Sequence, residues 1–422
     1  MMRFGVGLGL WLTAAAPVWA QSDAVDAPLS AINWLSESVE QPQTAAVAPV
    51  LGTQATRTPD ANEDPVANSA STPDVSVQPL GGAAPRVLGV LSPAATGFPL
   101  GIWENSDAET LAALLMAEEI DTLPALQDLL TTLALTQANP PREGAATGSF
   151  FLARVDKLLA FGALEPAQAL LEAATPDTGP LFQRWFDVSL LTGTEDAACA
   201  SLQDKPDVAP TPAARVFCLA RSGDWSTAAL TLNTGVALGD IDADTGALLA
   251  RFLDPELFEG EADLETPDRV TPLTFRMFEA IGAPLATANL PRAFSHADLR
   301  ENVGWKGQLE AAERLARAGA LADNRLIGLY TARVPAASGG VWERARAVTA
   351  FNAALANGNN RGIDAAMLRL WREAQSFGVM VPLAQVYAPQ LLASSADPTQ
   401  RFKWLLLSDS YEDAALDPTI AQ

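Results

Sequence analysis

The feature that most constrains this chain is a helical spacing of apolar residues that runs through most of its length. From Asp107 to Ser410, amphipathic segments alternate with short stretches that contain Gly, Pro or Asp. Segments 110–120, 123–138 and 149–161 carry apolar residues three and four positions apart, and they lack the alternation and β-branched clusters of strands. We therefore predict an all-α fold of helices joined by short turns.

Glycines recur at the ends of these predicted helices at intervals of about 30 residues. Leu158 to Gly162, Leu190 to Gly193 and Leu219 to Gly223 each lead from leucine to a glycine suited to end a helix, and an Ala-rich segment follows each. Gly282 and Gly319 close similar stretches later in the chain.

This helix–Gly–helix pattern resembles the turn of tetratricopeptide-like α-solenoids over roughly residues 150–420. The period is shorter than is usual in that family, and its Trp, Tyr and Pro signature positions are absent. The resemblance implies a fold of stacked helix-turn-helix repeats and implies no particular function. We assign residues 106–290 to N-terminal repeats and residues 291–422 to C-terminal repeats.

Residues 1–20 have the layout of a secretory signal peptide. Met1-Met2-Arg3 is a short basic region, Phe4 to Ala16 is apolar and too short to span a bilayer, and Val18-Trp19-Ala20 is a cleavage site of the small-x-small type. Gln21 follows the expected cut after Ala20, so no lipid anchor is expected. The sequence therefore predicts a periplasmic or secreted protein.

Residues 21–74 are predicted to form a disordered tether rich in Ala, Pro and Thr. A short helix is expected at 30–39, either docking on a partner or folding back on the body. Its docking side chains would be Ile32, Trp34, Leu35 and Val39. Residues 75–105 are apolar but rich in Gly and Pro, which predicts an extended segment packed on the helical body.

The net charge and the two cysteines limit which partners and which bound metals we expect. A net charge of −23 disfavours nucleic acid, because the surface would repel the phosphate backbone. No stretch after the leader has the apolar length of a membrane span. Cys199 and Cys218 are the only cysteines and are predicted to form a disulfide in an oxidising compartment, with no metal site.

The possible catalytic and metal-binding motifs have simpler structural explanations. His296 is the only histidine, and Ser295 and Asp298 beside it are expected to form a capping box. Asp242 or Asp244, in a stretch that mimics a calcium loop, is expected to cap a helix. The catalytic Glu-Ser motif of the lytic transglycosylases is absent. We predict no enzyme activity, no catalytic residues and no cofactor.

Basic residues gather in the C-terminal part. Between Arg292 and Arg372 the chain has 12 basic and seven acidic side chains, against the acidic trend of the whole. Arginines next to tryptophans are typical of sites that bind carboxylates or stacked ligands. Alternatively, these arginines form ion pairs with acids on the same helices and only stabilise the fold. The candidate binding residues are Trp305, Arg314, Arg317, Arg333, Trp342, Arg344, Arg346, Arg369, Trp371 and Arg372. The loop 335–340 before Trp342 is either a backbone N–H site for a ligand or an ordinary connection.

Together these features predict an exported helical-repeat scaffold or adaptor in the cell envelope. Its partner would be a protein, with an anionic cell-wall component as a second possibility. The alternatives are an accessory protein of an envelope machine, such as a flagellar motor or secretion complex, and a peptidoglycan-active enzyme.

Overall fold

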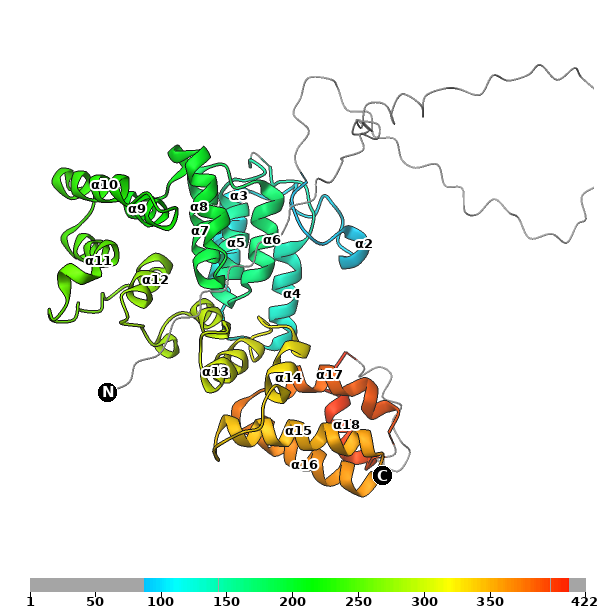
Figure 1. Ribbon diagram of the computed structural model, residues 1–422. Coiled ribbons are helices and arrows are strands. Elements are labelled where there is room, and N and C mark those ends of the chain that lie inside the picture. Colours follow the sequence, from blue (N-terminus) through cyan, green and yellow to red (C-terminus); the bar gives the residue numbers. More distant parts are fainter. Residues whose placement is uncertain (1–86, 143, 395, 410–422) are drawn as a thin grey trace, which may run out of the picture. The chain divides into compact units, whose positions relative to one another are not determined.

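The computed structural model describes residues 87–142, 144–394 and 396–409, and the regular elements within these ranges are helices (Figure 1). Isolated β-bridges occur there, but no strand does. This confirms the predicted all-α class. The signal peptide, the tether and the docking residues Ile32, Trp34, Leu35 and Val39 lie outside the described residues.

The first described residues are extended and lie against the end of a helix. Leu88 forms an antiparallel bridge with Ala138, and Leu91 a parallel bridge with Thr136. The next elements are α2 (Pro93–Thr96), α3 (Ala108–Ala117) and α4 (Pro124–Leu135). Asp107 starts α3 by accepting a hydrogen bond from the Thr110 N–H, and proline occupies the first turn of α4.

The middle of the chain is a series of helices in which each packs on the next. They are α5 (Ser149–Phe161), α6 (Leu164–Ala174), α7 (Gly179–Thr192), α8 (Glu195–Asp204), α9 (Pro212–Arg221), α10 (Trp225–Leu238), α11 (Ala243–Leu253) and α12 (Pro272–Ala280). Gly162 and Gly193 end α5 and α7 in the left-handed conformation, as the glycine pattern predicts. The regular solenoid implied by the repeats remains a prediction.

Short 3₁₀ helices interrupt the series, and a further set of α-helices completes the described chain. The 3₁₀ helices are η1 (Pro206–Val208), η2 (Pro255–Phe258), η3 (Thr287–Asn289) and η4 (Arg292–Leu299). The later α-helices are α13 (Trp305–Ala316), α14 (Asp323–Thr331), α15 (Val341–Asn357), α16 (Asn360–Phe377), α17 (Met380–Leu392) and α18 (Pro398–Leu405). Across the described ranges, no helix combines the length and apolarity needed to cross a bilayer.

Three apolar clusters form the core. The first centres on α5 and α6 and includes Phe294 of η4. The second contains side chains from the helices α7 through α12, and the third contains side chains from α13 through α18. Trp185 and Leu285 pack against both the first and the second cluster. The first and second apolar clusters are therefore in contact with each other.

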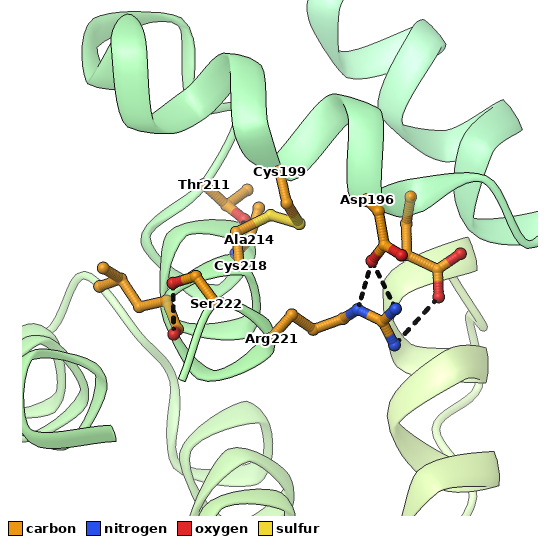
Figure 2. Close-up of a disulfide and its surroundings, with 9 residues drawn as sticks. Asp196, Cys199, Thr211, Ala214, Cys218, Arg221 and Ser222 are labelled. Atoms are coloured by element: carbon orange, nitrogen blue, oxygen red, sulfur yellow. Dashed lines mark hydrogen bonds and ion pairs between the residues drawn. A yellow bond between two sulfur atoms is a disulfide. The ribbon is translucent and has the colours of Figure 1, made fainter. Parts of the chain in front are cut away.

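The predicted disulfide is present. Cys199 of α8 and Cys218 of α9 are both buried, and their Cα atoms are 5.0 Å apart (Figure 2). On the same two helices Arg221 binds the carboxylate of Asp196 at 2.5 Å, next to the sulfur bridge. The covalent bond and the ion pair both fix α8 against α9.

Two local predictions have different outcomes. Asp242 caps α11 through the Thr245 N–H at 2.9 Å, so its carboxylate has the capping role expected of it. The capping box at Ser295 is wrong, because Ser295 lies inside η4. Its hydroxyl contacts Arg314 Nη1 at 3.1 Å, and Asp298 accepts a hydrogen bond from Thr287.

Replacing both cysteines by alanine (C199A/C218A) is expected to lower the free energy of unfolding by about 3 kcal/mol, because the bond restrains the unfolded chain. Its two cysteines are 19 positions apart in sequence. Urea unfolding followed by circular dichroism measures the loss. Leu230→Ala, at an exposed position of α10, is the control and should leave stability unchanged. A double variant as stable as the parent would contradict the structural role of the bond.

Candidate binding surface

Arg344, one of the predicted binding residues, is buried and forms an ion pair with Glu313 of the same chain. Its Nε and Nη2 donate to the two carboxylate oxygens of Glu313 at 2.5 and 2.6 Å, and Tyr330 Oη donates to the same carboxylate at 2.6 Å. Burial, and then the charge of Glu313, raises the pKa of Tyr330 well above its usual value, which keeps this hydroxyl a donor. The group forms a closed buried network, because each charged member has its partner.

The three predicted tryptophans are packing residues. Trp305 is buried, donates from Nε1 to Leu329 O at 2.9 Å and contacts the ring of Trp342 with centroids 5.1 Å apart. Trp371 meets the fully buried Trp404 edge-on at 5.3 Å. These indoles join α13 to α15 and α16 to α18.

Arg314 and Arg317 also make contacts within the chain, although Arg317 is exposed. Arg314 donates to the carbonyl oxygens of Thr287 and Leu290 at 2.8 and 2.6 Å, which ties α13 to the segment around η3. Arg317 lies over the ring of Phe377, 5.1 Å from its centroid. Both guanidiniums are thus held by contacts within the chain.

The remaining predicted arginines lie nearer the surface. Arg346 and Arg369 both bind Glu343, at 2.6 and 2.9 Å, whereas Arg333 and Arg372 are exposed and have no ion pair within the described residues. The structure therefore gathers Arg346 and Arg369 around one carboxylate but does not bring the ten predicted residues into one groove.

The glycine loop before α15 is likewise explained by local contacts. The Gly339 N–H donates to the Glu343 carboxylate at 3.4 Å, a side chain of the first turn of α15. Gly339 and Gly340 have φ values of 86° and 53°, which glycine adopts without strain. This geometry matches the ordinary inter-helix connection.

An apolar surface on α3 and α4 is the feature that the sequence interpretation missed. Six large apolar side chains between positions 114 and 129 are exposed, with Leu114 at 60% and Leu123 at 69% of their surface. They are Leu114 and Met116 on α3, Ile120 and Leu123 in the connection to α4, and Leu126 and Leu129 on α4. Met116 lies two positions from Leu114 and so on the other side of α3. We call Leu114, Leu123, Leu126 and Leu129 the leucine face. None of the α3 residues is fully buried, so this helix contributes little to the core.

A pocket opens beside the leucine face and is lined mostly by leucines. Leu111, Leu114 and Leu115 come from α3, and Leu130 and Leu133 come from α4. Phe150 and Arg154 of α5, together with Trp103, complete a cavity of about 170 Å³ that we call the leucine pocket. Helical spacing places Leu126 and Leu129 on the same face of α4 as Leu130 and Leu133, so the pocket and the leucine face are continuous.

Two buried cations of α5 hold the pocket walls in place. Arg154 donates to the carbonyl oxygens of Ala134, Thr136 and Leu88 at 2.7, 2.8 and 3.2 Å, which fixes the end of α4. Burial lowers the pKa of Arg154 to about 10, so it stays charged at neutral pH.

Lys157 performs the same task at the other wall. Its ammonium donates to Glu118 O at 2.7 Å, at the end of α3. Side chains of α5 thus bind carbonyl groups at the C-terminal ends of both helices. The pocket therefore exists before any ligand arrives.

One acidic side chain lines the leucine pocket, and others lie on or next to α3. Glu118 lines it, and Glu109 and Glu119 are exposed on or next to α3. Burial lowers the pKa of Lys157, and the charge of Glu118 acts in the opposite direction. The lining of the pocket is thus mainly apolar, with one carboxylate and the guanidinium of Arg154.

A separate hollow of about 600 Å³ gathers aspartates distant in sequence. Asp128 lies on α4, Asp323 begins α14 and Asp409 follows α18. Burial, followed by the charges of Asp128 and Asp409, raises the pKa of Asp323 to about 6. Across the residues that the structure describes, no group of three or more His, Cys, Asp or Glu side chains is arranged to hold a metal ion.

Comparison of the chain with protein-family models, curated proteins and solved structures gave no significant match. The one sequence signal of the apolar surface is the density of leucine between Leu111 and Leu135, which exceeds what one buried helix face requires.

Arg344→Met is expected to destabilise the protein by about 3 to 5 kcal/mol, because it leaves the Glu313 carboxylate buried without its partner. Arg346→Met, on the same helix but at the surface, should cost less than about 1 kcal/mol. Urea unfolding of the two variants measures both changes. Equal losses would contradict the assignment of Arg344 to the interior.

Asp323→Asn is expected to stabilise the protein at pH 7.5 by about 1 kcal/mol, a figure reduced from the full pKa shift because the group is half-buried. The folded-state pKa of Asp323 is raised, so the folded state binds the proton more tightly than the unfolded chain does. Unfolding free energy therefore falls as pH rises through that pKa of about 6.

Thermal unfolding from pH 4 to pH 8 measures this dependence, and it should be flatter in Asp323→Asn than in the parent. Asp240→Asn, at an exposed position before α11, is the matched control and should keep the parent's profile. If the pH dependence of thermal stability is the same in Asp323→Asn as in the parent, the hollow does not raise the pKa of Asp323.

Proposed function

We propose that this protein is an exported helical adaptor that binds a protein partner through the leucine pocket and the adjoining leucine face. The observation that carries the proposal is the exposure of Leu114 on α3, Leu123 at the start of α4, and Leu126 and Leu129 on α4. Contiguous exposed apolar surface is costly in water, and in soluble proteins it commonly marks an interaction site.

The composition of the surface supports a protein partner over an anionic cell-wall component. The centre is leucine, with Trp103 and Phe150 in edge-to-face contact at 5.0 Å at the pocket. An apolar centre with a polar edge is the usual anatomy of protein–protein interfaces. The exposed carboxylates of Glu109 and Glu119, on and next to α3, would repel an anionic polymer.

Export is supported by the leader-like residues 1–20 and by the paired cysteines, because disulfides persist in oxidising compartments. The tetratricopeptide-like interpretation belongs to the same proposal. Stacked helix pairs would offer a long surface for a partner while each pair contacts mainly its neighbours. An accessory role in an envelope machine would use the same surface and differ only in the partner.

Site-specific photo-crosslinking tests this function. A photoreactive phenylalanine analogue at Leu126, on the leucine face, is expected to crosslink the full chain to a protein in cells that express it. The same analogue at Leu238, which is 72% exposed at the end of α10, is the matched control. The Leu126 product should disappear when Leu123→Asp is added, because a charge at this face opposes apolar docking. Equal products from Leu126 and Leu238 would argue against an adaptor surface on α3 and α4.

A further inference from the structure

The helices α4 and α6 and the helices α13 to α18 belong to different apolar clusters. Of the described residues, none is part of both the first and the third cluster. The short helix η4 packs on α5 and α7 on one side and on α13 on the other. The ion pair of Arg325 with Glu165, at 2.9 Å, also joins the two groups of helices. The groups are therefore separate packing units that meet at a boundary.

The hollow of about 600 Å³ lies at this boundary, and both groups of helices line it. Asp128 of α4 and Glu165 of α6 are on one side, and Asp323 of α14 and Gln385 of α17 are on the other. Asp409 is held on the second side by two hydrogen bonds with Gln385, both of 3.0 Å. We call this cavity the aspartate hollow, because its aspartates come from both groups.

The carboxylate of Asp128 extends across the boundary. Its Oδ1 would lie 3.2 Å from a Cβ atom added at Gly319, which is in the turn between α13 and α14. A small movement of α4 therefore changes the distance between Asp128 and the aspartates on the other side.

The other charged side chains of the lining have partners of their own. Glu165 is paired with Arg325. Arg317 of α13 is the basic side chain of the lining, and it lies over the ring of Phe377, 5.1 Å from the centroid. The helix α17 contributes no charged side chain to the hollow. Within the described residues, no ion pair joins an aspartate of the hollow to a basic side chain.

The three aspartates therefore act mainly on one another. Partial burial, followed by the charge of Asp409, raises the pKa of Asp128. Burial, followed by the charges of Asp128 and Asp409, raises the pKa of Asp323 to about 6. Such carboxyl groups hold their protons more tightly when they are close together than when they are apart and hydrated. Protonation thus favours a narrow hollow, and this preference is lost as pH rises through about 6.

We propose that the aspartate hollow is a pH-sensitive contact between the two groups of helices, narrow when its aspartates carry protons and wider when they are ionised. The pH of the surroundings then sets the spacing between α4 and α6 on one side and α14 and α17 on the other. The inference goes beyond the adaptor function and does not depend on it.

Two spin labels across the hollow test the inference in the full chain. Ala125→Cys on α4 and Gln390→Cys on α17 are at exposed positions, and the two native cysteines are bonded to each other, so the labels attach to the new thiols. Double electron–electron resonance measures the label distances at pH 5 and pH 7.5. The ratio of short to long distances is expected to fall about tenfold over this range, because a pKa difference of about 1 between the two states corresponds to a factor of ten.

Controls separate the hollow from the rest of the chain. Labels at Arg372→Cys and Gln390→Cys, on two helices of the same group, should give a distance that does not change with pH. Asp128→Asn/Asp323→Asn should keep the short distance across the hollow at both pH values, because asparagine is uncharged and similar in shape. Asp240→Asn, at an exposed position, should retain the response of the parent. Circular dichroism at both pH values checks that each variant is folded.

Three results would overturn the inference. One is a distance across the hollow that is equal or longer at pH 5 than at pH 7.5, and the labelled parent alone decides this point if the double variant does not fold. Another is a pH response that persists in Asp128→Asn/Asp323→Asn, which places the titrating group elsewhere. The third is a flattened stability profile in Asp323→Asn together with a constant label distance in the parent, which means that Asp323 titrates inside a rigid hollow.

Discussion

The fold depends on satisfying the carbonyl groups at helix ends that lie inside the protein. Such carbonyls have no partner within their own helix, and burying them without one is costly. Arg154, Lys157 and Arg314 donate to backbone carbonyls of other elements, and the imidazole of His296 contacts Gly162 O at 2.6 Å. These contacts join α5 to α3 and α4, α13 to η3, and η4 to the end of α5. The apolar clusters can then pack because the polar ends between them are occupied.

A second set of contacts pairs charges between helices, and it explains much of the basic segment. Glu195 of α8 is buried and binds Arg276 of α12 at 2.6 Å, while Glu279 of α12 binds Arg300 at 2.7 Å. Arg344 and Glu313 form a similar pair further along the chain. Arg300 and Arg344 of the C-terminal part thus meet acids distant in sequence and neutralise them. Other acids, such as Glu109 and Glu119, remain exposed on and next to α3.

The helical class, the glycines that end α5 and α7 and the Cys199–Cys218 bond could be predicted from the sequence. The first two depend on local spacing, and the chain has only two cysteines to pair. The sequence was insufficient where a side chain meets a partner across the fold. Arg344 and Arg346 look alike in sequence, yet one faces Glu313 in the interior and the other faces Glu343 near the surface. The leucine pocket was missed for the same reason, since helical spacing identifies an apolar face but not whether another helix covers it.

The carbonyl contacts of Arg154, Lys157 and Arg314 require no ionised carboxylate. Burial alone would raise the pKa of Glu279, but Arg300 and Arg276 lower it on balance, so its contribution to stability is lost as pH falls through that lowered value. A carbonyl oxygen does not titrate in this range, and the cations that bind it stay charged. At acidic pH, the junctions around the leucine pocket would therefore outlast the carboxylate pairs between α8, α12 and the end of η4.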